Sequence, residues 1–154
     1  MKDPFVYALY LSFISHRPDF VYPFVEQSDD NGTYSEVIRS SEGHIALNLV
    51  RPGCYVGDCY HIKKVKDFIP IIGNALIRTR KYDQEDITDN RGNPEKPTII
   101  RVLPGCAYRI CNEGESSILV MSWCNELDVE NDKDIYDEPV EKVEVVEEAE
   151  HYYY

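Results

Sequence analysis

The sequence predicts an all-β domain, either a sandwich or a barrel, and three observations carry this prediction. Short stretches of alternating apolar and polar residues recur along the chain, turn residues such as Gly, Pro, Asn and Asp separate them, and no stretch shows convincing helical periodicity. Short strands at roughly 8–12-residue spacing are typical of sandwiches and barrels. The 154 residues are enough for one domain with a hydrophobic core, and 43% apolar residues indicate a folded globule.

The expected strands follow one another between residues 20 and 124, and the turns between them carry recognisable signals. Asn31-Gly32 is a strong hairpin signal, and Pro52-Gly53 and Pro104-Gly105 turn the chain again. The charged residues 83–96 are predicted to form a long exposed loop, and residues 7–15 fit either a short helix or a first strand. The strands are expected at residues 20–25, 34–39, 44–50, 54–61, 68–72, 75–82, 98–103, 107–111 and 117–124.

The composition changes at residue 137, so we expect a domain at residues 1–136 and an acidic C-terminal extension at residues 137–154. The extension holds seven acidic residues and one lysine, a charge of −6 that is half of the net charge of −12. Like-charge repulsion favours a solvated tail, whereas the alternation in residues 139–146 would also allow pairing with a sheet edge. The tyrosines at 152–154 offer aromatic surface for docking on a partner or a second copy.

The charge and the cysteines exclude several classes of protein. A net charge of −12 argues against binding to nucleic acid or to an anionic membrane surface. No stretch approaches the ~20 apolar residues of a membrane span, and the N-terminus lacks the layout of a signal peptide. The five cysteines are odd in number and form no Cys-x-x-Cys pair, which indicates free thiols. We therefore expect an intracellular, cytoplasmic protein, with a place in a large assembly such as a virus particle left open.

Several motifs together resemble one known family. Residues 29–36 are similar to its D-x-R-G-x-[FV]-x-E signature, with Asn31 in place of Arg, and residues 57–68 follow the layout of its metal motif. Residues 121–126 and 130–134 are similar to its closing W-x-N-E and E-N-P-D-T segments. On these motifs the chain resembles, over roughly residues 7–136, the C-terminal cupin domain, an RmlC-like jelly roll, of bacterial CapF-type capsular-polysaccharide nucleotide-sugar epimerase/reductases.

This resemblance implies a cupin double-stranded β-helix, or jelly roll, that is often dimeric. The family's site binds zinc and epimerises C3 of a UDP-4-keto-6-deoxy sugar. That chemistry removes a proton beside a ketone while a metal ion or hydrogen-bond donors stabilise the enolate. The sequence contains no G-x-G-x-x-G motif for a nicotinamide cofactor.

The metal motif departs from the family at three of its four ligand positions. The family's first histidine falls on Cys59, its second on His61, its glutamate on Lys66 and its later histidine on Tyr108. Zinc usually takes three or four protein ligands, so we expect no cofactor at this site. If a metal does bind, the ligands expected are Cys59, His61 and Cys106.

Two functions of different classes fit such a domain. One is a metal-free, stand-alone nucleotide-sugar 3-epimerase in surface-glycan synthesis, with His61 and Tyr108 as the proton-transfer pair. Lys66 or Arg78 would then hold a phosphate or an enolate oxygen, with Tyr60 as a further substrate-binding residue. The other is a catalytically degenerate cupin that serves as a structural or binding module, in a homodimer or with an assembly partner, and could still bind a sugar nucleotide. The replaced ligands favour the second function.

Overall fold

The computed structural model describes residues 24–127 and 133–142, and within them the fold is built from strands alone. No helix occurs in these two ranges, so the described residues include none that could cross a membrane. The predicted all-β class is confirmed. The strands are β1 (Val25–Ser28), β2 (Gly32–Ser40), β3 (Gly43–Val50), β4 (Tyr55–Tyr60), β5 (Lys66–Ile72), β6 (Ala75–Lys81), β7 (Ile87–Gly92), β8 (Ile100–Val102), β9 (Cys106–Cys111), β10 (Ile118–Cys124) and β11 (Tyr136–Asp137).

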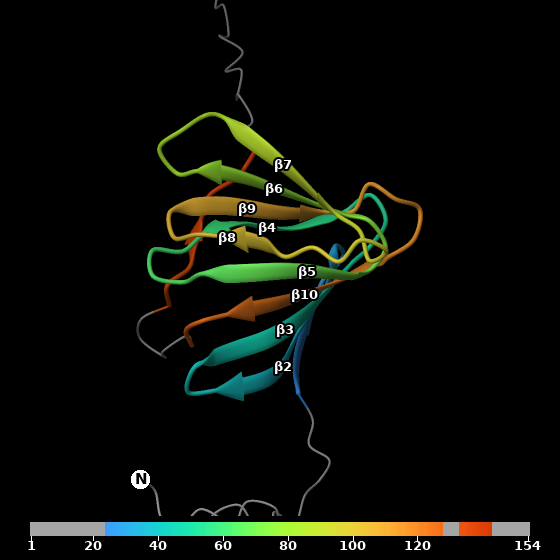
Figure 1. The fold of residues 1–154 in the computed structure, drawn as a ribbon. Helices are drawn as coiled ribbons and strands as arrows, with labels where there is room; N and C mark the ends of the chain where they lie inside the picture. Colours follow the sequence, from blue (N-terminus) through green and yellow to red (C-terminus); the bar gives the residue numbers. More distant parts are fainter. Residues whose placement is uncertain (1–23, 128–132, 143–154) are drawn as a thin grey trace, which may run out of the picture.

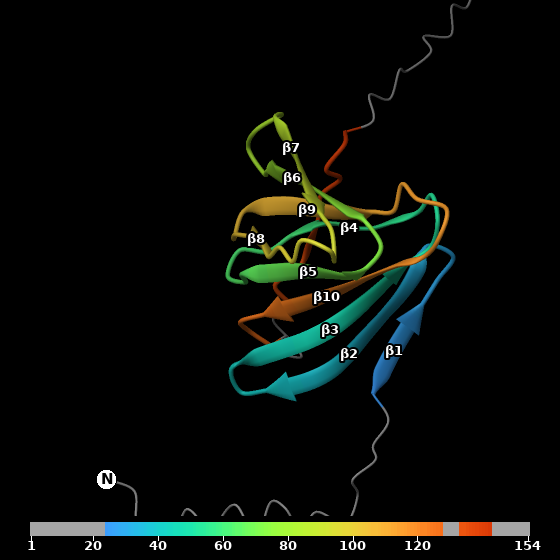
Figure 2. The same cartoon turned by 45° about the vertical axis from the view of Figure 1, so that its right-hand side comes forward.

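The strands form two antiparallel sheets that lie one over the other (Figure 1). Sheet A has six strands in the order β1-β2-β3-β10-β5-β8, and sheet B has five in the order β11-β4-β9-β6-β7. Figure 2 shows β1 beside β2 at one edge of sheet A. Neighbours such as β3 and β10 are distant in sequence, which is the crossover pattern of a jelly roll rather than of a simple meander.

The core lies between the sheets because one face of each central strand is apolar. In β3 the inward residues Ala46 and Val50 are fully buried, and their neighbour β10 contributes Val120 to the same layer. Sheet B supplies Ile77 and Ile110, and these side chains belong to one continuous apolar cluster with Phe68 of sheet A. Buried and outward residues thus alternate with the two-residue period of a β-strand.

The prediction of a long loop over residues 83–96 is wrong, because β7 occupies Ile87–Gly92 and pairs with β6 along six residues. The strand is at the edge of sheet B, where charged side chains reach solvent and also ion partners. Asp89 pairs with Arg78 at 3.1 Å, and Arg91 pairs with Glu113 at 2.9 Å. The backbone pairing with β6 holds this charged strand in place, although its composition resembles that of a loop.

The structure describes only part of the two ends of the chain. Residues 7–15 lie outside the described residues, as do most of the strand expected at 20–25, and β1 begins at Val25. At the other end, β11 spans the expected boundary between residues 136 and 137 and pairs with the edge strand β4. Residues 138–142 continue across sheet B, and residues 143–154 are outside the described residues.

Gly57 and Asp58 give β4 an irregular step beside β9. Both residues have positive φ, 115° for Gly57 and 58° for Asp58, and the register shifts between Gly57 and Cys59. A Cβ atom on Gly57 would lie 2.7 Å from the backbone oxygen of Tyr108, so only glycine allows the two strands to approach this closely. After this irregularity, the pairing of β4 with β9 continues at Cys59 and Tyr108. Both side chains belong to the core cluster between the sheets.

Candidate functional site

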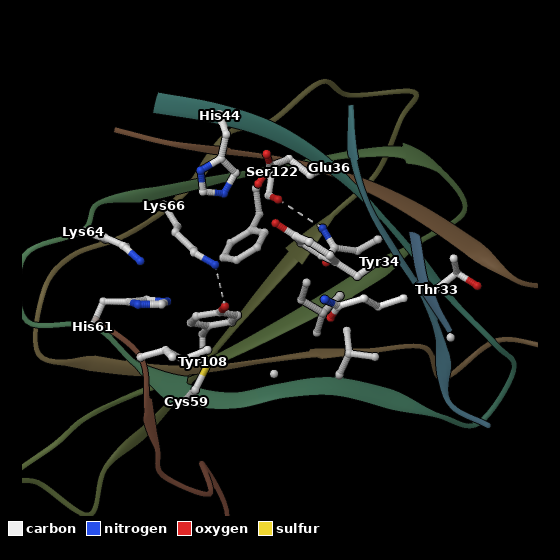
Figure 3. Close-up of a pocket in the computed structure, with 18 of the residues that line it drawn as sticks. Thr33, Tyr34, Glu36, His44, Cys59, His61, Lys64, Lys66, Tyr108 and Ser122 are labelled. Carbon is white, nitrogen blue, oxygen red and sulfur yellow. Dashed lines mark hydrogen bonds between the residues drawn. The ribbon is translucent and has the colours of Figure 1, made fainter. Parts of the chain in front are cut away.

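A cavity of about 740 Å³ opens between the two sheets (Figure 3). Its walls come from the inward faces of β2, β3, β5 and β10 in sheet A and of β4 and β9 in sheet B. The side chains that define its chemistry are Tyr34, His44, Cys59, His61, Lys64, Lys66, Tyr108 and Ser122. A volume of this size is within the range of small-molecule sites.

The centre of the cavity is a lysine–tyrosine pair. The Lys66 Nζ atom donates to the Tyr108 Oη at 3.0 Å, and the same ammonium lies 5.3 Å from the centre of the Tyr108 ring (Figure 3). Phe68 also packs against Tyr108, with the two ring centres 4.9 Å apart. Burial raises the pKa of Tyr108 well above its ordinary value, so the phenol stays protonated at neutral pH. Burial likewise raises the pKa of the Cys59 thiol.

His61 is held in one orientation by the chain that follows the gap at 128–132. Its Nδ1 atom is hydrogen-bonded to the backbone oxygen of Asp134, so Nδ1 carries the proton and Nε2 is left as an acceptor. That Nε2 atom is buried and has no hydrogen-bond partner among the described residues. Burial, and next the positive charge of Lys66, lower the pKa of His61 to about 4. The imidazole is therefore neutral at physiological pH, with a free lone pair.

Asp134 also shapes the loop that carries the lysines. Its carboxylate accepts hydrogen bonds from the backbone N–H groups of Ile62, Lys63 and Lys64, at 2.8, 2.8 and 3.1 Å. Burial alone raises the pKa of this carboxyl, but these three hydrogen bonds outweigh it and hold the pKa below its usual range. One residue thus fixes both the ring of His61 and the start of the loop that leads to Lys66.

Replacing Asp134 with asparagine is expected to lower the free energy of unfolding by about 1–3 kcal/mol, because the charge that three backbone donors share is lost. Urea unfolding at pH 7 measures this. The contribution is present above pH 4 and is lost as the pH falls through the depressed pKa of the folded state, so the two proteins should converge in acid. The exposed Asp86→Asn is the matched control, and an equal loss in both variants would contradict this role for Asp134.

The structure brings together four of the residues singled out from the sequence and separates three others. Cys59, His61, Lys66 and Tyr108 all line the cavity. Cys106 does not line it. Arg78 and Tyr60 alternate with core residues of β6 and β4 and lie on the outer face of sheet B.

Arg78 and Tyr60 were expected to contact a substrate, but neither residue lines the cavity. Both have partners on the outer face of sheet B. Arg78 forms ion pairs with Asp89 and Glu141. The Tyr60 ring lies between those of Tyr82 and Tyr136, with centroid distances of 4.9 and 5.2 Å.

The cavity residues do not fit a zinc ion. Within the described ranges, no three residues of the His, Cys, Asp or Glu type are close enough to hold a metal, so Cys59, His61 and Cys106 do not form the alternative ligand set. The position where the family has a glutamate carries the Lys66 ammonium, a charge that repels a cation.

Some site residues were not singled out from the sequence. His44 and Ser122 face the cavity from adjacent strands, and alternation along those strands would have found them. Asn48 donates to the Ser122 Oγ at 3.2 Å and to the backbone of Val120 at 3.2 Å, which ties the floor of the cavity together. Asp134 is 73 positions from His61, so no local pattern could have paired them.

A two-sheet β domain with a polar cavity between its sheets is the architecture of a cupin, and comparisons with known proteins narrow this class to a family. Residues 27–136 match the family described as "Polysaccharide biosynthesis C-terminal domain", and the chain belongs to that family. It is 30% identical over 132 residues to a UDP-2-acetamido-2,6-beta-L-arabino-hexul-4-ose reductase of Pseudomonas aeruginosa (strain PA103), with 84% of this chain and 36% of the relative covered.

Solved structures agree with this assignment. The capsular polysaccharide assembling protein CapF from Staphylococcus aureus has a similar fold, with a TM-score of 0.78 and 28% identity, over 90% of this chain and 38% of CapF. A structure of CapF with the inhibitor 3-isopropenyl-tropolone gives a TM-score of 0.79 at 28% identity, over 90% of this chain and 41% of that chain. The chain thus spans well under half the length of these relatives. The expected C-terminal cupin domain of the CapF type is confirmed.

Proposed function

We propose that this domain is a metal-independent binding module of polysaccharide biosynthesis, which holds an anionic sugar nucleotide in its cavity without epimerising it. The observation that carries the proposal is the Lys66 ammonium on the Tyr108 hydroxyl, at the position where the family would place a carboxylate ligand. The cavity is kept while its metal ligands are replaced by a cation and a phenol. This combination suits an anion better than a metal.

The physical reason is electrostatic. An ammonium in a partly enclosed cavity interacts with an anion through a lower effective dielectric than in water, so the attraction is stronger than at the surface. Lys66 retains donor capacity beyond its bond to Tyr108, because an ammonium has three N–H groups. A diphosphate or a sugar carboxylate supplies the matching acceptors. The matched relative acts on a UDP-linked hexulose according to its name, which supports a sugar nucleotide as the ligand class.

Replacing Lys66 with methionine is expected to weaken the binding of a UDP-linked amino sugar at least tenfold, because it removes the ammonium and keeps the length of the side chain. A tenfold change equals about 1.4 kcal/mol. Isothermal titration calorimetry with UDP-N-acetylglucosamine and with UDP alone measures it. The control is Lys96→Met, an exposed lysine outside the cavity. Equal affinities for the unmodified protein and Lys66→Met would remove the basis of the proposal.

A metal-free 3-epimerase is the second candidate, and the orientation of His61 favours it. Its neutral imidazole has a buried Nε2 lone pair, so it could take a proton from the carbon beside a ketone. The protonated Tyr108 could return a proton, and the Lys66 ammonium could stabilise the enolate oxygen in the role that a metal ion has in the family. In the binding module, the same Nε2 atom would accept a hydrogen bond from a sugar hydroxyl instead.

Either function belongs to the chemistry of nucleotide sugars, and we propose an intracellular setting because that is where such activated sugars serve biosynthesis. A sugar nucleotide that binds without reacting could give the domain a sensing or tethering role in a larger complex. The comparisons give no support to a place in a virus particle.

A further inference from the structure

The segment at residues 133–142, which we call the strap, contacts the cavity with one end and the outer face of sheet B with the other. Lys133 and Ile135 line the cavity. Between them, Asp134 binds the ring of His61 and the backbone N–H groups of residues 62–64. The strap then pairs with the edge strand β4 through β11 and continues across sheet B (Figure 1). One short segment therefore joins two separate parts of the molecule.

The middle of the strap has few backbone contacts with the sheet. β11 pairs with β4 at two residues, Tyr136 and Asp137. The N–H group of Glu138 adds a hydrogen bond to the backbone oxygen of Asp58 at 2.8 Å. Two-stranded pairing as short as this is marginally stable by itself. The position of Asp134 must therefore depend on what holds the residues that follow β11.

Two arginines of sheet B hold the far end of the strap through Glu141. Arg78 and Arg109 are direct cross-strand partners on β6 and β9, an arrangement in which like charges repel. Asp89 offsets the charge of Arg78, and Asp58 offsets that of Arg109. The carboxylate of Glu141 binds both, because Oε1 accepts from Arg78 and Oε2 accepts from Arg109 at 2.8 Å. Glu141 thus stabilises the arginine pair as well as anchoring the strap.

A buried valine and a third arginine complete the anchor. The Val140 side chain is fully buried, and its backbone N–H donates to the Asp58 carboxylate at 3.1 Å. The guanidinium of Arg80 donates to the backbone oxygens of Val140 at 3.0 Å and of Pro139 at 2.8 Å. Residues 138–142 are therefore held by side chains of sheet B, whereas residues 133–135 reach the cavity.

We propose that the strap positions the cavity residues: its anchor on sheet B holds Asp134 in place, and Asp134 in turn holds His61 and residues 62–64. That these residues meet a ligand rests on the proposed function. Loosening of the anchor should reach the cavity, although neither Val140 nor Glu141 lines it. Coupling between two sites is reciprocal, so a ligand in the cavity should also tighten the strap.

Val140→Asp tests the coupling, because a carboxylate at this buried position beside Asp58 is expected to expel the strap from sheet B. Amide hydrogen exchange of the unliganded protein, followed by NMR, should show the N–H groups of residues 62–64 exchanging about tenfold faster. Amides of β3 and β10 in sheet A should keep their rates. Lys142→Gln is the control, because it removes an exposed ion pair with Glu85 and should leave residues 62–64 unchanged.

Two results would overturn the proposal. One is faster exchange within residues 138–142 with unchanged rates at residues 62–64, and the other is an equal acceleration in β3 and β10, which would show a general loss of stability. If circular dichroism shows that Val140→Asp does not fold, Glu138→Gln/Glu141→Gln takes its place, because it removes two acids of the anchor and keeps the buried side chain. Its rates at residues 62–64 should rise roughly threefold, and unchanged rates would again overturn the proposal.

Calorimetry with UDP-N-acetylglucosamine separates this inference from the proposed function. The affinity of Val140→Asp should be about tenfold lower than that of the unmodified protein and of Lys142→Gln. Equal affinities would show that the strap does not position the ligand-binding residues. Faster exchange at residues 62–64, together with no binding by the unmodified protein, would contradict the proposed function and still support the positioning of the cavity residues by the strap.

Discussion

Replacing Arg80 with methionine is expected to lower the free energy of unfolding by about 3–5 kcal/mol, the range seen when one partner of a buried ionic network is removed. The guanidinium is buried, with 2% of the residue exposed. It donates to the backbone oxygens of Val140 at 3.0 Å, Pro139 at 2.8 Å and Gln84 at 2.9 Å, and it pairs with Glu138. Methionine fills similar space and satisfies none of these acceptors.

Removal of the Arg80 guanidinium should also release residues 138–142 from sheet B, because Arg80 binds Glu138, Pro139 and Val140 in this segment. Val140 donates its backbone N–H to Asp58, which in turn forms two hydrogen bonds of 2.7 Å with Arg109. Urea unfolding followed by circular dichroism measures the change. Arg91→Met is the control, because Arg91 is 66% exposed and its pair with Glu113 is a surface contact worth little. An Arg80→Met variant as stable as Arg91→Met would show that the C-terminal segment does not stabilise the domain.

The stability of the domain is expected to fall by about 3 kcal/mol as the pH is lowered from 7 to 4. The pKa of His61 is lowered to about 4 in the folded state, from an ordinary value of 6.5. Between these two values the unfolded chain binds a proton at this position and the folded chain does not, so unfolding takes up protons and acid favours it. A difference of about 2.5 pKa units corresponds to roughly 3 kcal/mol.

The test is urea unfolding at half-unit steps between about pH 3 and 7.5, with His61→Asn measured beside the unmodified protein. Asparagine can still donate to the backbone oxygen of Asp134, but it does not titrate in this range. Between pH 6.5 and 4, the free energy of unfolding of the variant should therefore depend much less on pH than that of the unmodified protein. At lower pH both proteins should lose stability, because the depressed pKa values of Asp134 and Glu85 act there. An unchanged slope in His61→Asn would contradict a buried neutral histidine.

Most of the fold was predictable because strand alternation and turn residues are local signals. The pair Asn31-Gly32 predicted the turn that joins β1 and β2, and the alternation from His44 to Val50 predicted β3. The strand β7 was missed because its charges are satisfied by Arg78 and Glu113, which no local pattern reveals. The ion partner of Arg91 in β7, for example, is Glu113, which is 22 positions away in the chain.

The site was predictable in part, for a similar reason. Cys59 lies on β4 and His61 directly follows that strand, and alternation over these two positions predicted that both side chains share a face. The phase of β6 was ambiguous, because Leu76 and Ile77 are both apolar and both buried, so the sequence did not show that Arg78 faces outward. The hydrogen bond between His61 and Asp134 depends on a segment that returns to the cavity from the far end of the chain.

Incubation with a UDP-4-keto-6-deoxy sugar in D₂O, followed by proton NMR, tests the central claim most directly. A domain that binds without reacting should transfer saturation to the sugar nucleotide, lose that transfer in Lys66→Met, and leave the proton at C3 unexchanged. Deuterium at C3 that appears faster than in buffer and is lost in His61→Asn would contradict the claim, and it would establish His61 as the base of a metal-free epimerase.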